Sequence, residues 1–119
     1  MKLIYLDAAT HDRHVAAISH LPHLVAAALV EVAEEMGGWE AASTGFRDTT
    51  RLASSNPPMR TDIVARNRGP VMASIDALVR QLTALRGQIE SGDDAALCRY
   101  LEQSRARREA WLASQQGAE

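Results

Sequence analysis

Apolar residues recur along this chain at the spacing of α-helices. In its second half the apolar positions follow one another at steps of three and four residues: Val71, Ile75, Leu78, Leu82, Leu85 and Ile89. This spacing predicts an amphipathic helix that begins at Pro70 and that Gly92 ends. A last helix is predicted from Asp93 or Asp94, with apolar residues at Leu97, Leu101, Trp111 and Leu112.

The first half of the chain is predicted to begin with a long helix, capped by Asp7 or Thr10 and ended by Gly37-Gly38. Residues 24–32 are apolar on nearly all sides, which is typical of a helix buried in a core or in an oligomer interface. Pro22 removes one backbone hydrogen bond and is therefore expected to kink the helix at the two residues before it, His20 and Leu21.

Two shorter helices are predicted in the middle of the chain. One is polar and runs from about Gly45 to Ala53, and the next is capped by Asn56 and runs to about Asn67. Lys2–Leu6 is the only strand-like stretch, and it has no second strand to pair with. The expected fold is therefore all-α, a bundle of about five to six helices that shares its core with a partner.

Composition narrows the class of protein. The 119 residues suit one domain, and the single cysteine, Cys98, excludes an internal disulfide, so a cytoplasmic location is expected. The net charge of −2 argues against a nucleic-acid partner. We found no uninterrupted apolar run of the roughly 18 residues that span a bilayer, so no membrane partner is expected.

All four histidines lie in the first predicted helix, at His11, His14, His20 and His23. The first pair and the second pair each share a face, but the two faces point in opposite directions, so one metal ion cannot collect all four. Two interpretations stay open for His20 and His23. They are either capping or interface groups, or their ring nitrogens bind an anionic ligand beside the proline.

A second polar cluster lies in the segment Gly45-Phe46-Arg47-Asp48-Thr49-Thr50-Arg51. On one helix, Arg47, Asp48 and Arg51 would lie near one face, where two guanidinium groups can clamp a carboxylate. From the residues alone, an exposed ion pair is the favoured interpretation. The chain has no GxGxxG and no Walker loop, so no dinucleotide or triphosphate is expected to bind it in the usual way.

These two polar clusters carry a family resemblance. His11-Asp12-Arg13 followed by Ser19-His20-Leu21-Pro22-His23 resembles the HD…SHLPH pattern of prephenate dehydrogenases. The segment from Gly45 to Ala53 is similar to that family's GF[RK]D.TR[IL]A motif. Asn56-Pro57, Asp62-Ile63 and Asn67 extend the likeness, which covers about Leu6 to Leu101.

The resemblance implies the C-terminal helical domain of a prephenate dehydrogenase, which forms an intertwined homodimer. Residues 1–7 would then be the last strand and linker of a Rossmann domain, and residues 8–119 the dimerisation and substrate-binding domain. The family oxidatively decarboxylates prephenate to 4-hydroxyphenylpyruvate in tyrosine biosynthesis, with NAD or NADP as cofactor. The chain alone is expected to bind no cofactor and to be inactive, because its sequence holds no NAD-binding domain.

The resemblance also implies roles for individual residues, with prephenate, 4-hydroxyphenylpyruvate or tyrosine as the ligand. Arg51 would bind a substrate carboxylate, and His23, with His20 or His11, would contact the pyruvyl side chain. Asp48 would hold this network, and Arg47 and Gly45 complete the expected substrate-binding set. No catalytic residue and no metal ligand is expected in this chain.

One position departs from the family pattern. Arg60 follows Met59 where the family commonly has tryptophan, which leaves the choice between prephenate and arogenate open. The alternative function is a standalone helical dimer that binds an aromatic-pathway ligand without catalysis. A small helical enzyme such as a chorismate mutase is the third hypothesis, although its arginine and lysine spacing is not evident.

Overall fold

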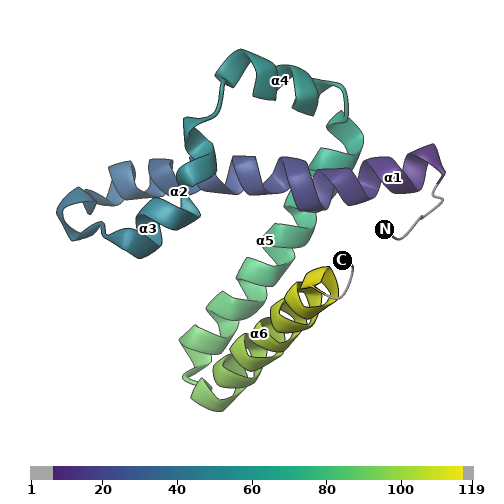
Figure 1. Cartoon of the computed structure of the whole chain (residues 1–119). Helices are drawn as coiled ribbons and strands as arrows, with labels where there is room; N and C mark the ends of the chain where they lie inside the picture. The colour runs from purple at the N-terminus through teal and green to yellow at the C-terminus, as the bar shows by residue number, and fades with distance from the viewer. Residues whose placement is uncertain (1–6, 117–119) are drawn as a thin grey trace. The chain divides into compact units, whose positions relative to one another are not determined.

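The computed structural model describes residues 7–116, and these residues form α-helices joined by short turns (Figure 1). The all-α prediction is confirmed for this part of the chain, in which no strand occurs. The predicted strand at Lys2–Leu6 lies outside the described residues. The chain divides into two compact units, one that ends at Asp76 and one that begins at Ala77, and each is described by itself.

The first unit opens with α1, Ala8–Val15, and Asp7 is its cap. The Asp7 carboxylate accepts a hydrogen bond of 2.8 Å from the backbone amide of Thr10. This backbone hydrogen bond, helped by a second one from the Thr10 hydroxyl, lowers the pKa of the Asp7 carboxyl below its ordinary value. Of the two caps that the sequence allowed, the structure therefore selects Asp7.

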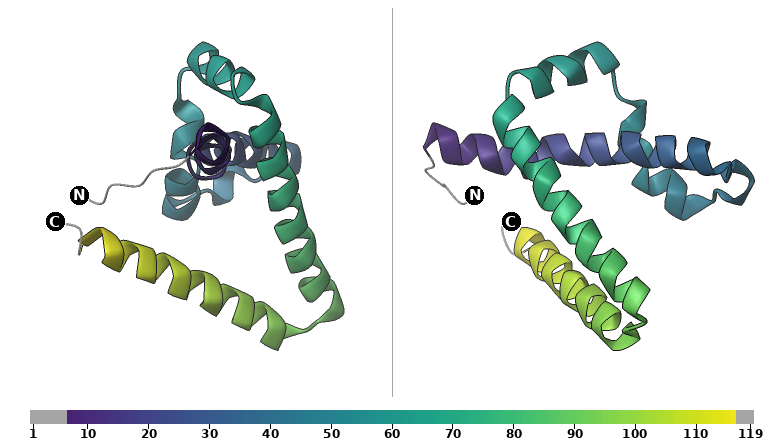
Figure 2. Two further views of the ribbon diagram at one scale, coloured as in Figure 1. Left: turned by 90° about the vertical axis from the view of Figure 1, so that its right-hand side faces the viewer. Right: turned by 180° about the vertical axis from the view of Figure 1, so that it is seen from behind.

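The irregularity expected before Pro22 takes the form of a π turn. Residues Ala16–His20 are π-helical, and the Leu21 amide donates to the Ala16 carbonyl, five residues earlier. The extra residue in this turn accommodates a proline, which cannot donate to the carbonyl four residues before it. α2, Leu21–Met36, then continues along the line of α1 (Figures 1 and 2), so the predicted kink is wrong in form.

Gly37 ends α2 as predicted. Its φ of 71° is left-handed, and its amide donates to the Ala33 carbonyl at 2.9 Å. Glycine adopts this conformation without the clash that a Cβ would cause, whereas Gly38, at a φ of −97°, has no such requirement.

Replacing Gly37 with alanine is expected to lower the free energy of unfolding by about 1 kcal/mol, the approximate cost of a left-handed alanine. This corresponds to a fall in Tm of roughly 5 °C, measured by circular dichroism at one fixed protein concentration. Gly38→Ala is the matched control. No atom lies within 4 Å of an added Cβ at either position, so only backbone conformation separates the two variants. Equal Tm values for both would contradict the interpretation.

Short helices complete the first unit. After a 3-10 turn at Trp39–Ala41, the segment predicted as one polar helix forms α3, Thr44–Thr49, and then a 3-10 turn, Arg51–Ser54. α4, Pro57–Ala65, follows the predicted cap at Asn56, whose side chain accepts from the Met59 amide at 3.0 Å. α5 begins at Arg68, two residues before the predicted start, and runs to Ser91.

Few of the described side chains are buried. Among the described residues, only Ala16, Ala26, Val71 and Ser74 are buried. Large apolar side chains of the first long helix stay in contact with solvent, with Ile18 79% and Met36 78% exposed. The helical run Ala8–Met36 is long and apolar enough, by length and composition alone, to cross a membrane. An apolar helix at a protein interface has the same composition, and the sequence had indicated a core or an interface for residues 24–32.

The second unit is a helical hairpin. Gly92, at a φ of 71°, ends α5, and α6, Asp94–Gln116, follows (Figure 2). The Tyr100 hydroxyl on α6 donates to the Gln81 side-chain oxygen on α5 at 2.8 Å. In the part of α5 that belongs to this unit, three large apolar side chains are more than half exposed: Val79, Leu82 and Ile89. Their spacing of three and seven residues is that of a coiled-coil seam, so this face of α5 is suited to a second helix.

Candidate functional site

The first unit contains a cavity of about 440 Å³ formed by residues of α2, the 3-10 turn Arg51–Ser54, α4 and the start of α5. Most of its walls are aliphatic. The polar and charged side chains that line it are His20, His23, Ser55, Arg60, Thr61 and Arg68. Among residues 7–116 no aspartate or glutamate lines it, so the arginines Arg60 and Arg68 set its charge. A cavity with apolar walls and a few convergent polar groups is the usual form of a small-ligand site.

His23 is fixed in this cavity by two neighbours. Its Nδ1 atom lies 3.0 Å from the Ser55 hydroxyl and 3.3 Å from the Leu52 carbonyl oxygen. The Ser55 hydroxyl itself donates to the same carbonyl at 2.6 Å. Because a carbonyl can only accept, the arrangement is satisfied when Nδ1 carries a proton. In the neutral ring, Nε2 is then free to accept a hydrogen bond from a ligand.

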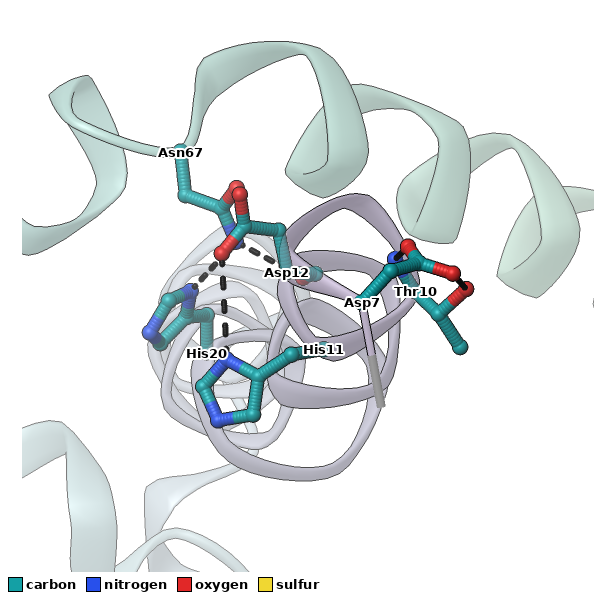
Figure 3. A network of polar contacts seen from close by, with 6 residues as sticks. All are labelled: Asp7, Thr10, His11, Asp12, His20 and Asn67. Atoms are coloured by element: carbon teal, nitrogen blue, oxygen red, sulfur yellow. Dashed lines mark hydrogen bonds and ion pairs between the residues drawn. The ribbon is translucent and has the colours of Figure 1, made fainter. Parts of the chain in front are cut away.

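His20, the last residue of the π turn, lines the same cavity and lies beside Asn67 (Figure 3). The Asn67 amide nitrogen is 3.5 Å from His20 Nδ1 and donates to the Asp12 carbonyl at 2.9 Å. This second bond joins residues 55 positions apart and ties α1 to the turn between α4 and α5. His20 and His23 therefore line the same cavity, as their three-residue spacing predicts.

His11 does not join this cavity. Its Nδ1 atom lies 3.8 Å from the Asp12 carboxylate, and both side chains are more than half exposed (Figure 3). Within residues 7–116 no three side chains of the types His, Cys, Asp and Glu come together as a metal site would require. Asp12 therefore lies between the two, since its carboxylate is near His11 and its backbone carbonyl accepts the hydrogen bond from Asn67.

The cluster around Arg47 and Arg51 has a different geometry from the predicted one. α3 ends at Thr49, and Arg51 begins the next 3-10 turn, so the two arginines do not share a helical face. The hydroxyls of Thr49 and Thr50 donate to the carbonyls of Gly45 and Phe46 at 2.8 and 2.7 Å. A threonine hydroxyl that bonds to the carbonyl four residues earlier competes with the backbone hydrogen bonds of a regular helix. These two bonds coincide with the early end of α3.

Both arginines nevertheless line one hollow. This second hollow, also of about 440 Å³, includes Arg47, Arg51 and the aromatic rings of Trp39 and Phe46. The two rings meet edge to face, with centroids 5.8 Å apart. Guanidinium groups beside aromatic walls suit a ligand that carries both a ring and a carboxylate.

Asp48 and Gly45 line neither hollow. Asp48 forms no ion pair with Arg47 or Arg51, all three of which the structure describes, and its role in holding the substrate-binding network stays a prediction. Sequence reasoning did not place Ser55 or Arg68 in the site, and it treated Arg60 only as a departure from a motif. These residues carry no local signal, because the turns that bring them to the cavity are set by tertiary packing.

The comparisons with known proteins agree on one family. A family model described as the dimerization domain of prephenate dehydrogenase matches residues 7–103. The chain is 34% identical over 113 residues to a prephenate dehydrogenase of Bacillus subtilis, covering 91% of this chain and 30% of that protein. It is 33% identical to a cyclohexadienyl dehydrogenase of Zymomonas mobilis, covering 88% of this chain and 38% of that protein. The chain thus spans about a third of the length of these relatives.

Solved structures show the same likeness. An arogenate dehydrogenase of Synechocystis matches with a TM-score of 0.85 and 33% identity, over 93% of this chain and 42% of that one. A prephenate dehydrogenase from A. aeolicus, in complex with hydroxyphenyl propionate and NAD+, matches with a TM-score of 0.82 and 32% identity. That match covers 90% of this chain and 39% of the other.

Proposed function

Since this chain belongs to the prephenate dehydrogenase family, through that family's dimerization domain, we propose that it is the dimer-forming, substrate-facing part of such an enzyme. The enzyme would oxidatively decarboxylate prephenate, or the related arogenate, in tyrosine biosynthesis. The observation that carries this proposal is the cavity at His20 and His23. Residues of the family-like motif line this ligand-sized space, and no described aspartate or glutamate lines it.

The proposed homodimer rests on the apolar surface of the helices. Val79, Leu82 and Ile89 of α5 are each more than half exposed at coiled-coil spacing, and Ile18 and Met36 are exposed on the first long helix. Clustered apolar side chains at a protein surface mark a protein–protein interface. A second copy of the chain, placed on these faces, would remove them from water.

The proposed ligand chemistry follows from the two hollows. A substrate with two carboxylates and a ring needs fixed cations and an apolar wall. We assign a substrate carboxylate to Arg51, which lies with Arg47 beside Trp39 and Phe46. We assign the polar contacts of the substrate side chain to His23, oriented by Ser55, and to His20. His11 and Asp48 lie outside both hollows, so neither is assigned a direct contact.

NAD is the cofactor that the family implies, and when bound it accepts the hydride. The residues that the structure describes contain no strand and glycine-rich turn of the kind that holds a dinucleotide pyrophosphate. No residue of 7–116 is therefore assigned to the cofactor. The contribution proposed for these residues is to bind the substrate, orient it and pair the subunits.

Two measurements on the purified chain test this proposal. Light scattering over a range of concentrations is expected to give twice the mass of 13.0 kDa. Calorimetric titration with 4-hydroxyphenylpyruvate, the product of the proposed reaction, is expected to show saturable binding. A mass of 13.0 kDa at all concentrations would contradict the dimer, and a dimer that binds no hydroxyphenyl acid would contradict the substrate-facing role.

A further inference from the structure

Trp39 forms one wall of the hollow that contains Arg51, and its indole ring is held by two contacts. The indole Nε1 atom donates a hydrogen bond of 2.8 Å to the Glu34 carboxylate in the last turn of α2. The ring also meets that of Phe46 edge to face, with an angle of 80° between the two ring planes. Trp39 is 44% exposed, so burial alone does not fix the ring, and its orientation depends on these two contacts.

Glu34 itself lies outside the hollow. It is exposed, does not line the hollow, and forms no ion pair among the described residues. The backbone between Glu34 and Trp39 is fixed separately, because the amides of Gly37 and Gly38 both donate to the Ala33 carbonyl, at 2.9 and 3.2 Å. These backbone bonds set the path of the turn but leave the side-chain torsions of Trp39 free. The hydrogen bond to Glu34 restricts those torsions.

A fixed aromatic wall has a use beside a carboxylate-binding arginine. One carboxylate of prephenate is bonded directly to the ring, so the ring follows that carboxylate into whichever hollow binds it. An aromatic side chain offers the ring of a ligand an apolar contact in an offset or edge-to-face arrangement. A side chain that is already held in place loses less conformational entropy when the ligand binds, so it contributes more to affinity.

We propose that Glu34 is a positioning residue of the substrate site. Its hydrogen bond holds Trp39 as the wall against which the substrate ring packs, while Arg51 binds the carboxylate on that ring. Glu34 acts through Trp39 and does not touch the substrate. This inference rests on the proposed function, because it takes the hollow as the place where that carboxylate binds.

Fluorescence anisotropy tests the positioning itself, without a ligand. Trp111→Phe leaves Trp39 as the single tryptophan of the chain. In this background Glu34→Ala is expected to lower the anisotropy of Trp39, because the indole ring gains freedom. Glu34→Gln should keep the anisotropy, because the amide oxygen of glutamine accepts the same N–H. An anisotropy that Glu34→Ala leaves unchanged would overturn the proposal.

Calorimetric titration with prephenate tests the consequence for binding. Glu34→Ala is expected to weaken the affinity by about three- to tenfold, the contribution of one aromatic contact, and Glu34→Gln should restore it. Both substitutions remove a negative charge, which by itself favours an anionic ligand, so a loss confined to Glu34→Ala cannot come from charge. Glu35→Ala is the matched control, because Glu35 is the next exposed glutamate of α2 and does not line the hollow. It should not weaken binding.

A second background separates positioning from a purely structural role. In Trp39→Phe, which keeps a ring but has no N–H, Glu34→Ala should cause no further loss of affinity. A further loss equal to that seen with Trp39 present would show that Glu34 acts by another route. That result, or an unchanged affinity in Glu34→Ala alone, would overturn the positioning role and leave the proposed function standing. If the unaltered chain does not bind prephenate, the proposed function fails, and the positioning role fails with it.

Discussion

Replacing Leu82 with glutamate is expected to convert the proposed homodimer into a 13.0 kDa monomer. Leu82 is 54% exposed in the chain and lies between Val79 and Ile89 on the apolar seam of α5. In a symmetric dimer each substitution occurs twice, and an unpaired carboxylate buried in an interface costs about 3–5 kcal/mol. Since 1.4 kcal/mol is a factor of ten, the dissociation constant should rise at least about 100-fold.

The matched control for this variant is Ala84→Glu. Ala84 is an exposed residue of the same helix, and at 100° per residue it points well away from the seam. The added charge is the same, so Ala84→Glu should remain a dimer by light scattering at concentrations where Leu82→Glu is monomeric. A dimer that persists in Leu82→Glu would place the interface on other faces of the chain.

The helices were predictable because their ends have local causes. Asp7, Asn56, Gly37 and Gly92 each act on backbone groups within a few residues. The sequence alone therefore locates Asn56, Gly37 and Gly92, and it narrows the first cap to Asp7 or Thr10. It was harder to predict which apolar residues of a helix are buried within the chain. Val71 is buried while Ile75, Leu82 and Ile89 are exposed, although all four belong to one predicted stripe. Which side of α5 packs within the chain depends on tertiary contacts that periodicity does not contain.

The site was predictable to a similar extent. His20 and His23 share a cavity because they lie three residues apart on one helical run. The predicted clamp of Arg47, Asp48 and Arg51 assumed one continuous helix. α3 instead ends at Thr49, where the hydroxyls of Thr49 and Thr50 bond to backbone carbonyls. Ser55 reaches His23 from 32 residues away. A contact across that separation follows from the packing of the turn after α3, and no spacing rule predicts it.

Replacing Arg51 with alanine is expected to weaken binding of prephenate, which carries two carboxylates, by about 10- to 100-fold. Arg51 lines the hollow that contains Trp39 and Phe46, and a hydrogen bond between charged groups contributes about 1.5–3 kcal/mol. The Tm should change little, because the Arg51 side chain is exposed and forms no ion pair among the described residues. Calorimetric titration and thermal unfolding measure the two effects separately.

Arg66→Ala is the control that makes the Arg51 result specific. It removes an exposed arginine that lines neither hollow, so a general loss of positive charge would weaken binding equally in both variants. If only Arg51→Ala loses affinity, the carboxylate lies in the hollow beside Trp39. If Arg51→Ala binds as tightly as the unaltered chain, Arg51 has no part in the site. The cavity at His20 and His23 would then be expected to hold both carboxylates of the substrate, and among the described residues Arg60 and Arg68 are the arginines that line it.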